Sequence, residues 1–301
     1  MLPKRLLPTT LEDSVPVSGS DKELIMRFAI IIPAAGASTR FGAGDKLGQD
    51  FGGRPLLLRS IEPFAKRDDV HAVIVAGPPD ELENFQDRYG AQLSFLGGQI
   101  VAGGRLERWE TVRNALEAVP SGCTHVAIHD GARPLVDEML IDRVFEAAKT
   151  FPAVVPGVPV RDTLKRGGTE LVEAAERDAT VDSILGLDDG DFAAGGILGS
   201  EPSIGHQVSA RRIEGTIDRT NLWRMQTPQV FEIELLRRAY AQPDLAGATD
   251  DAMLIQRLGE PVMMVEGSER NLKVTTMDDL VIARAISGIK EPEGRPAHKR
   301  F

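Results

Sequence analysis

A loop rich in small residues, with two cations, follows the first strongly apolar run of the sequence. The run 28–33 (FAIIIP) leads into Ala-Ala-Gly and then into a stretch that contains Arg40 and Lys46. Backbone N–H groups of small residues can approach a phosphate closely, and the two cations can neutralise its oxygens. The pattern therefore indicates a triphosphate-binding loop, although an ordinary solvated turn uses the same residue types.

Two other glycine-rich loops fit this stretch poorly. A dinucleotide fingerprint needs G-x-G-x-x-G, but five residues separate Gly36 from Gly42. A Walker A loop ends in Gly-Lys-Ser or Gly-Lys-Thr, whereas Lys46 follows Asp45 and precedes Leu47. An NAD-linked dehydrogenase and a P-loop ATPase are both disfavoured. Nucleotidyl transfer fits better, because pyrophosphate leaves with several negative charges that cations stabilise.

The elements that must position this loop alternate between strand and helix. Apolar runs occur at 28–33, 71–77, 125–130 and 152–160, and segments with helical spacing separate them. Strands that are apolar on both sides indicate a mostly parallel sheet covered by helices on both faces. We therefore predict an α/β fold with a doubly wound, Rossmann-like nucleotidyltransferase sandwich. Ligands of such sheets bind at the carboxyl ends of the strands.

Several further elements follow from periodicity. Leu106, Trp109, Val112 and Leu116 fall on one face of a predicted helix. Near the carboxyl end of the chain we expect a strand pair at 261–267 and 271–275 and a final helix at 277–287. Helical spacing also occurs from Leu140 through Val144 to Ala148, and helix-like segments lie around 232–240 and 249–258.

The composition excludes several classes of function. The 301 residues carry a formal net charge of −10, which argues against a general nucleic-acid-binding surface. No apolar run reaches the roughly 18 residues that a membrane-spanning helix needs, so a membrane role has no support. One cysteine, Cys123, rules out an internal disulfide and a cysteine-based metal cluster, and a reducing cytoplasm is the expected compartment.

The chain divides into one large domain with flexible additions. We expect residues 1–27 to form a flexible extension, 28–287 to form the domain, and 288–301 to be a tail. Within the domain, the stretch 167–214 is acidic in the middle and rich in Gly and Ser. Such a composition favours a loose surface excursion.

Six blocks in order carry a resemblance to a known family. They read PAAGASTRFGAGDK, HDGARPLV, VPVRDT, IDRTNLWRMQTPQVF, ATDDAMLI and GSERNLKVTTMDDL. This series resembles the 2-C-methyl-D-erythritol 4-phosphate cytidylyltransferases of non-mevalonate isoprenoid synthesis, from residue 28 to 287 apart from 167–214. The resemblance implies transfer of CMP from CTP to the sugar-alcohol phosphate, with release of pyrophosphate. It also implies an arm over residues 157–220 that joins a homodimer.

The resemblance assigns roles to individual residues. The triphosphate loop comprises Ala34, Ala35, Gly36, Ser38, Arg40 and Lys46, with Asp45 and Leu47 replacing the proline and glutamine that are usual beside the lysine. The cytosine and ribose segment comprises Gly103, Arg108 and Thr111. By the resemblance, Asp130 is expected to contact the nucleotide and to lie near the Mg²⁺ that bridges phosphate oxygens. A single carboxylate suits this hard cation, which prefers oxygen ligands and retains water.

The remaining assignments concern the acceptor phosphate and the reaction. The residues expected to hold the acceptor are Arg133, Thr163, Arg219, Thr227, Thr249 and Asp250. Lys273 is expected to reach the α-phosphate, where charge accumulates. No general base is needed, since the attacking phosphate monoester is already anionic at neutral pH.

Two alternatives to this function stay open at the level of sequence. The acceptor could be ribitol 5-phosphate or another alditol phosphate, because cytidylyltransferases for those acceptors are similar. The chain could also be a nucleotide-binding regulatory module without turnover, for which Asp45, Leu47 and the 167–214 stretch are the only support.

Overall fold

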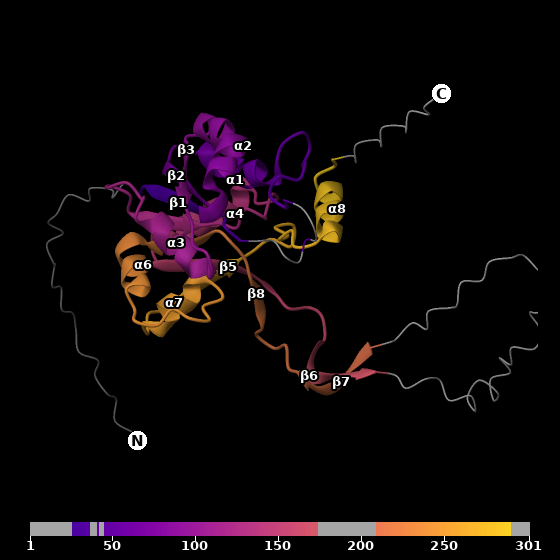
Figure 1. Ribbon diagram of the computed structural model, residues 1–301. Coiled ribbons are helices and arrows are strands. Elements are labelled where there is room, and N and C mark those ends of the chain that lie inside the picture. The colour runs from indigo at the N-terminus through magenta and orange to yellow at the C-terminus, as the bar shows by residue number, and fades with distance from the viewer. Residues whose placement is uncertain (1–25, 37–40, 42–44, 174–208, 290–301) are drawn as a thin grey trace, which may run out of the picture. The chain divides into compact units, whose positions relative to one another are not determined.

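The computed structural model describes residues 26–36, 41, 45–173 and 209–289 (Figure 1). The chain divides into two compact units. We call the first, Met1–Gly157 with Met225–Phe301, the body, and the second, Val158–Arg224, the arm unit. The predicted boundaries of 1–27 and 288–301 fall mostly on residues outside the described part.

The body is built on one sheet whose strands run in the order β10-β5-β9-β4-β1-β2-β3, with β8 paired to β5. The neighbours β10 and β5, β4 and β1, β1 and β2, and β2 and β3 are parallel, whereas β9 is antiparallel to both β4 and β5. The prediction of a mostly parallel sheet is therefore confirmed. The strands are β1 (Phe28–Pro33), β2 (Val70–Gly77), β3 (Gly98–Ala102), β4 (His125–Ile128), β5 (Ala153–Pro159), β8 (Trp223–Met225), β9 (Gln229–Glu232) and β10 (Met263–Glu266).

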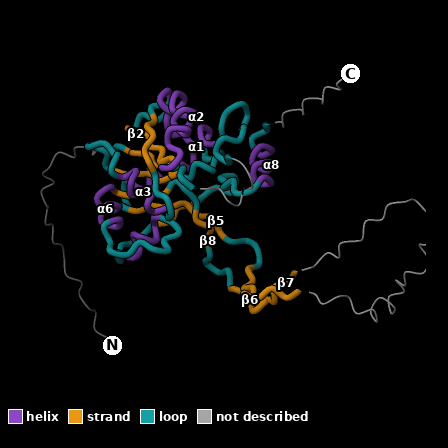
Figure 2. The backbone as a smooth tube through the Cα atoms, viewed as in Figure 1, coloured by secondary structure: helices purple, strands orange, loops and turns teal. Residues whose placement is uncertain are grey.

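Helices cover both faces of this sheet, and β1 shows why both faces need covering. Ala29 and Ile31 belong to one core cluster, together with residues of α3, α6 and α7. Phe28, Ile30 and Ile32 belong to the other, together with residues of α1, α2 and α4. Alternate residues of a strand point to opposite faces, so an all-apolar strand fills two cores at once. The helices are α1 (Leu56–Ala65), α2 (Leu82–Phe95), α3 (Arg108–Leu116), α4 (Glu138–Ala148), α6 (Ile233–Tyr240), α7 (Asp251–Arg257) and α8 (Met277–Ile286), with a short 3-10 turn at Pro79–Glu81 (Figure 2).

Side chains fix where several of these helices begin. At α3, Glu107 and Glu110 form a reciprocal capping box. At α8, Thr276 and Asp279 do the same, and at α4 the Asp137 carboxylate accepts a hydrogen bond from the Leu140 N–H. Such caps satisfy N–H groups that lack partners within the first helical turn. No helix in the described ranges is long and apolar enough to span a bilayer.

The arm unit contains an antiparallel pair, β6 (Leu164–Glu173) and β7 (Ser209–Ile217). The prediction of a loose excursion over 167–214 is therefore wrong at both ends, because these strands occupy 167–173 and 209–214. Backbone pairing between distant segments leaves no clear mark in a composition rich in Gly and charge. Residues 174–208 lie outside the described part of the chain.

Two further predictions need correction. Residues 271–275 do not form a strand, and Val274 instead donates one backbone hydrogen bond of 2.8 Å to Ala132 O. Leu106 precedes α3 and is 87% exposed, so it is not on the buried helix face. Of the remaining members of that face, Val112 and Leu116 are buried as predicted, and Trp109 is partly buried against the same core cluster.

The double-sided core predicts a large cost for truncating β1. Ile30→Ala should lower the free energy of unfolding by about 2–5 kcal/mol, because Ile30 is fully buried and the cavity would collapse only partly. The matched control is Ile282→Ala on α8, whose side chain is 50% exposed and whose loss should cost less than about 0.5 kcal/mol. Urea unfolding measures both, and equal costs would contradict this assignment of the core.

Candidate active site

A cavity of about 320 Å³ opens at the carboxyl ends of β1 and β4. Ala34, Ala35 and Gly36 contribute from the end of β1, and Asp130 from the end of β4. The rest of the lining includes Lys46, Gly104, Arg105, Leu106, Glu107, Arg108, Thr111 and Lys273. The structure therefore brings together side chains from four distant stretches of the sequence at the edge where the topology predicts a ligand.

Asp130 is the centre of the polar contacts in this cavity. Its Oδ2 lies 3.0 Å from Lys273 Nζ and accepts a hydrogen bond of 3.1 Å from Arg133 Nε. Its backbone N–H donates to Thr227 Oγ1 over 3.0 Å. The carboxylate side chain is only 12% exposed, so these partners replace most of its hydration.

The ionisation state of Asp130 follows from this setting. Burial alone would raise its pKa, but Lys273, followed by Arg108 and Arg133, outweighs burial and holds the pKa of Asp130 well below its usual range. Asp130 is therefore a carboxylate at neutral pH. It can hold Lys273 by charge or serve as an oxygen ligand.

A buried residue, Asp251, holds Arg108 at the cavity. Asp251 is 1% exposed; its Oδ2 lies 2.7 Å from Arg108 Nη1, and its Oδ1 accepts a hydrogen bond from the Tyr240 hydroxyl. Burial opposes the charge of Arg108, but Asp251 and Asp130 more than offset this effect and raise the pKa of Arg108 above its usual value. Arg108 is thus a fixed cation.

The side chains of Glu110 and Thr111 hold the loop before α3 by accepting hydrogen bonds from its backbone. Glu110 Oε2 accepts hydrogen bonds from the N–H groups of residues 105, 106 and 107, and Thr111 Oγ1 accepts one of 3.0 Å from Gly104. A side chain at Gly103 would overlap Ala35 and Thr111. This close packing explains the glycine at position 103 and fixes the loop that carries Leu106.

Most of the residues predicted for the nucleotide lie at this cavity. Ala34, Ala35, Gly36, Lys46, Arg108, Thr111, Asp130 and Lys273 line it, and Gly103 packs directly against Ala35. Ser38 and Arg40 lie outside the described residues. Lys46, Asp130 and Lys273 come from separate stretches and meet at one cavity, while their roles towards a ligand stay predictions.

The residues predicted for the acceptor phosphate are placed differently. Thr227 and Arg133 are buried behind Asp130, where Arg133 also donates a hydrogen bond of 2.8 Å to Asn271 O. Thr249 and Asp250 are not among the lining residues; the Asp250 carboxylate caps α7 through Met253 and accepts a hydrogen bond from Gln229. Thr163 and Arg219 belong to the arm unit. Their roles towards substrate stay predictions.

Sequence reasoning missed Asp251 and Tyr240, and it assigned Glu110 only a favourable charge at a helix start. Asp251 contacts a cation 143 positions away in the sequence, and that distance hides the pair from any local pattern. The Glu107 and Glu110 spacing ahead of an apolar run was the available signal for a capped helix. That spacing predicts where the helix begins, but not that the Glu110 carboxylate accepts hydrogen bonds from three backbone N–H groups.

The donor set at the cavity fits a divalent metal that is shared with substrate. No cluster of three or more His, Cys, Asp or Glu side chains suited to a metal occurs among the described residues. Asp130 supplies one ionised carboxylate. Mg²⁺ is commonly held by one or two carboxylates plus phosphates and water, so Asp130 together with a triphosphate would suffice.

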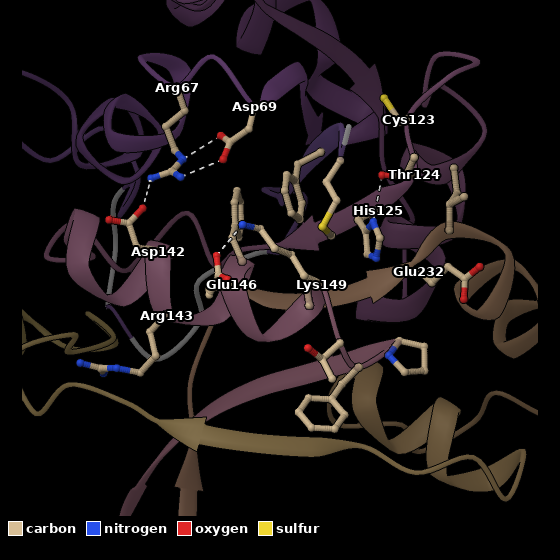
Figure 3. Close-up of a pocket in the computed structure, with 18 of the residues that line it drawn as sticks. Arg67, Asp69, Cys123, Thr124, His125, Asp142, Arg143, Glu146, Lys149 and Glu232 are labelled. Carbon is tan, nitrogen blue, oxygen red and sulfur yellow. Dashed lines mark hydrogen bonds and ion pairs between the residues drawn. The ribbon is translucent and has the colours of Figure 1, made fainter. Parts of the chain in front are cut away.

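A larger cavity, of about 1550 Å³, lies at the other end of the strands, where β1 and β4 begin (Figure 3). Its lining includes the amino-terminal residues of β1 and β4, Phe28 and His125. Arg67 is paired there with Asp69 and Asp142 at 2.8 Å and 2.7 Å. Because ligands of parallel sheets bind at the carboxyl ends, and these charges are already paired, the smaller cavity is the better candidate for catalysis.

The comparison with family models identifies the chain. The model for IspD, 2-C-methyl-D-erythritol 4-phosphate cytidylyltransferase, matches residues 28–183 and 201–288. The chain belongs to this family. The match extends into the 167–214 stretch that the motif comparison had set apart, and omits only 184–200 between its two parts.

Individual relatives agree with this family. A 2-C-methyl-D-erythritol 4-phosphate cytidylyltransferase of Salinibacter ruber is 35% identical over 91% of the chain and 96% of its own length. A bifunctional enzyme IspD/IspF of Desulfotalea psychrophila is 33% identical over 85% of the chain, which spans 55% of that relative. The crystal structure of the cytidylyltransferase from Thermus thermophilus is 32% identical, with a TM-score of 0.60 over 87% of this chain and all of that one.

The buried His125 predicts how stability depends on pH. Burial lowers its pKa to about 4, whereas an unfolded histidine titrates near 6.5. The unfolded chain therefore binds the proton first as pH falls, and the stabilisation that is complete above pH 6.5 is lost towards pH 4. Between pH 7 and pH 5 the wild type should lose about 1 to 2 kcal/mol more stability than His125→Gln.

Urea unfolding at a series of pH values measures this difference. The matched control is His71→Gln, because it makes the same replacement at a histidine that is exposed at the surface. If His125→Gln retained the full wild-type dependence, His125 would not be the group responsible.

Proposed function

We propose that this protein transfers CMP from CTP to 2-C-methyl-D-erythritol 4-phosphate and releases pyrophosphate. One observation carries the proposal besides family membership. In a chain of net charge −10, the described residues that line the small cavity include four cations and two carboxylates: Lys46, Arg105, Arg108 and Lys273 with Glu107 and Asp130. Such a convergence of four cations at one cavity suits a polyanion like a nucleoside triphosphate.

The proposed catalysis depends on charge neutralisation and alignment. Lys46, with Arg40 from the same loop, would neutralise the pyrophosphate end of CTP as it leaves. Lys273, held 3.0 Å from Asp130, would stabilise charge at the α-phosphate. The acceptor phosphate is already an anion at neutral pH and would attack the α-phosphorus in line, so no side chain has to remove a proton.

Specificity for the nucleoside would come from the loop before α3. Its backbone is fixed by Glu110 and Thr111, so Gly103, Gly104 and Leu106 would present a preformed surface to the base and ribose. Arg108 would add a fixed charge, because Asp251 already compensates its burial. A preformed site spends little binding energy on ordering itself.

A magnesium ion is proposed as the cofactor. Asp130 would hold it together with phosphate oxygens, and the bound ion would supply further neutralisation of the triphosphate charge. The contacts of Arg133 and Thr227 would keep the Asp130 carboxylate aimed at the cavity.

The assembly and the compartment are proposals as well. Exposed apolar side chains on the arm unit, among them Leu171 (57%) and Ile213 (62%), support a homodimer formed through that unit. By the family resemblance, Thr163, Arg219, Thr249 and Asp250 would contribute to acceptor binding. The buried, unpaired Cys123 is in keeping with a reducing cytoplasm.

The decisive assay for the reaction scores pyrophosphate release from CTP with purified protein and each acceptor. Turnover with 2-C-methyl-D-erythritol 4-phosphate should exceed turnover with ribitol 5-phosphate by at least about tenfold, which corresponds to about 1.4 kcal/mol in transition-state binding. Equal or faster turnover of ribitol 5-phosphate would overturn the proposed acceptor. Absence of turnover with both would favour a regulatory nucleotide-binding protein.

A variant pair separates chemistry from stability in that assay. Lys273→Ala should lower kcat by about a hundredfold or more, because the α-phosphate would lose its cation. Lys66→Ala changes an exposed lysine at the end of α1 and should leave kcat unchanged.

The arm-mediated dimer has its own test. Light scattering of the wild type should give twice the chain mass of 32.6 kDa, and Leu171→Asp with Ile213→Asp should give the single-chain mass. The matched control is Phe95→Asp, which replaces a 90% exposed side chain at the end of α2 and should remain dimeric. A monomeric wild type at micromolar concentration would refute the dimer.

A further inference from the structure

We propose that Asp45 is a positioning residue that fixes Lys46 at the cavity by tethering its turn to α2. The Asp45 Oδ2 atom accepts a hydrogen bond of 2.7 Å from the Tyr89 hydroxyl, and the same oxygen forms an ion pair with Arg88. Lys46 is the next residue and lines the cavity. The inference rests on the proposed role of Lys46 towards the triphosphate.

The anchor on α2 is rigid at its inner end. Tyr89 is 1% exposed and packs against Phe85, with ring centroids 4.8 Å apart. Burial, and then the hydrogen bond to Asp45, raises the pKa of Tyr89 well above its usual value, so the hydroxyl remains a donor. A donor held within the core fixes where the Asp45 carboxylate can lie.

The outer half of the tether lies against a glycine. A Cβ atom on Gly48 would overlap both the Arg88 guanidinium and the Asp45 carboxylate. The ion pair therefore covers the backbone of Gly48 directly. The Asp45–Arg88 pair therefore fixes the turn on both sides of Lys46, at Asp45 and at Gly48.

The other side of the turn is held by α1 and the core. Leu47 O accepts a hydrogen bond of 3.0 Å from Leu57 N, and the Leu47 side chain packs against two core clusters. Lys46 O accepts a hydrogen bond of 3.2 Å from Gln49 N. The backbone of Lys46 is thus held between two anchored neighbours, at a position where the residue lines the cavity.

The charges of the tether also suit a site for an anion. A carboxylate beside Lys46 would repel incoming phosphates, but the ion pair with Arg88 offsets the charge of Asp45. The tether thus fixes the turn without lowering the positive potential that Lys46 supplies. Prior ordering of this kind improves binding because less freedom is lost when the ligand arrives.

The test measures KM for CTP and KM for the acceptor separately. Asp45→Ala should raise KM for CTP about tenfold while KM for the acceptor changes less than twofold, since only the turn that carries Lys46 is released. Tyr89→Phe should act in the same direction. Asp87→Ala, an exposed acidic residue on the same helix, is the matched control and should leave both values unchanged.

A double-mutant cycle distinguishes positioning from general damage. In a Lys46→Ala background, Asp45→Ala and Tyr89→Phe should have no further effect on KM for CTP, because the side chain that they position is gone. Effects that multiply would overturn the inference, and so would single variants with wild-type KM for CTP. If the wild type itself fails to release pyrophosphate, the proposed function fails instead, and thermal melting shows whether each variant is folded.

Discussion

An ionised carboxylate that is nearly out of contact with water requires positive partners, and Asp130 has three. Lys273 and Arg133 contact it directly, and Arg108 acts on it through the field. Each partner comes from a different part of the chain, so this one charge draws the end of β4, the start of α3 and the 271–274 segment towards a common point. Removing the carboxylate would leave Arg133, whose side chain is 10% exposed, without its ionic partner.

Other parts of the cavity are also held by residues that lie behind them. Asp251 pairs with Arg108 and also accepts a hydrogen bond from Tyr240, and Glu110 holds the loop at 103–107. These contacts order Arg108 and the 103–107 loop without any ligand. For a reaction that depends on alignment and charge neutralisation, such prior order is the main contribution that the protein can make.

Local patterns predicted the parts of this structure that depend on local physics. Apolar runs gave β1, β2, β4 and β5, because a strand buried on both faces has an unmistakable composition. The prediction of a strand at 271–275 was wrong because the apolar residues Leu272 and Val274 pack in the same core cluster as Ala132 and do not pair with another strand. Asp251 and the β6–β7 pair could not be found, since both depend on contacts between residues far apart in sequence.

The point where the chain leaves the sheet and returns to it is closed by a backbone hydrogen bond of 2.8 Å from Gln226 N to Pro156 O. The segment between those two residues forms a closed loop, and the entropic cost of closing a flexible loop grows only with the logarithm of its length; doubling the length costs about 0.6 kcal/mol. Changes in the length of the intervening segment should therefore cost the sheet little stability. The family model leaves residues 184–200, within this segment, unmatched.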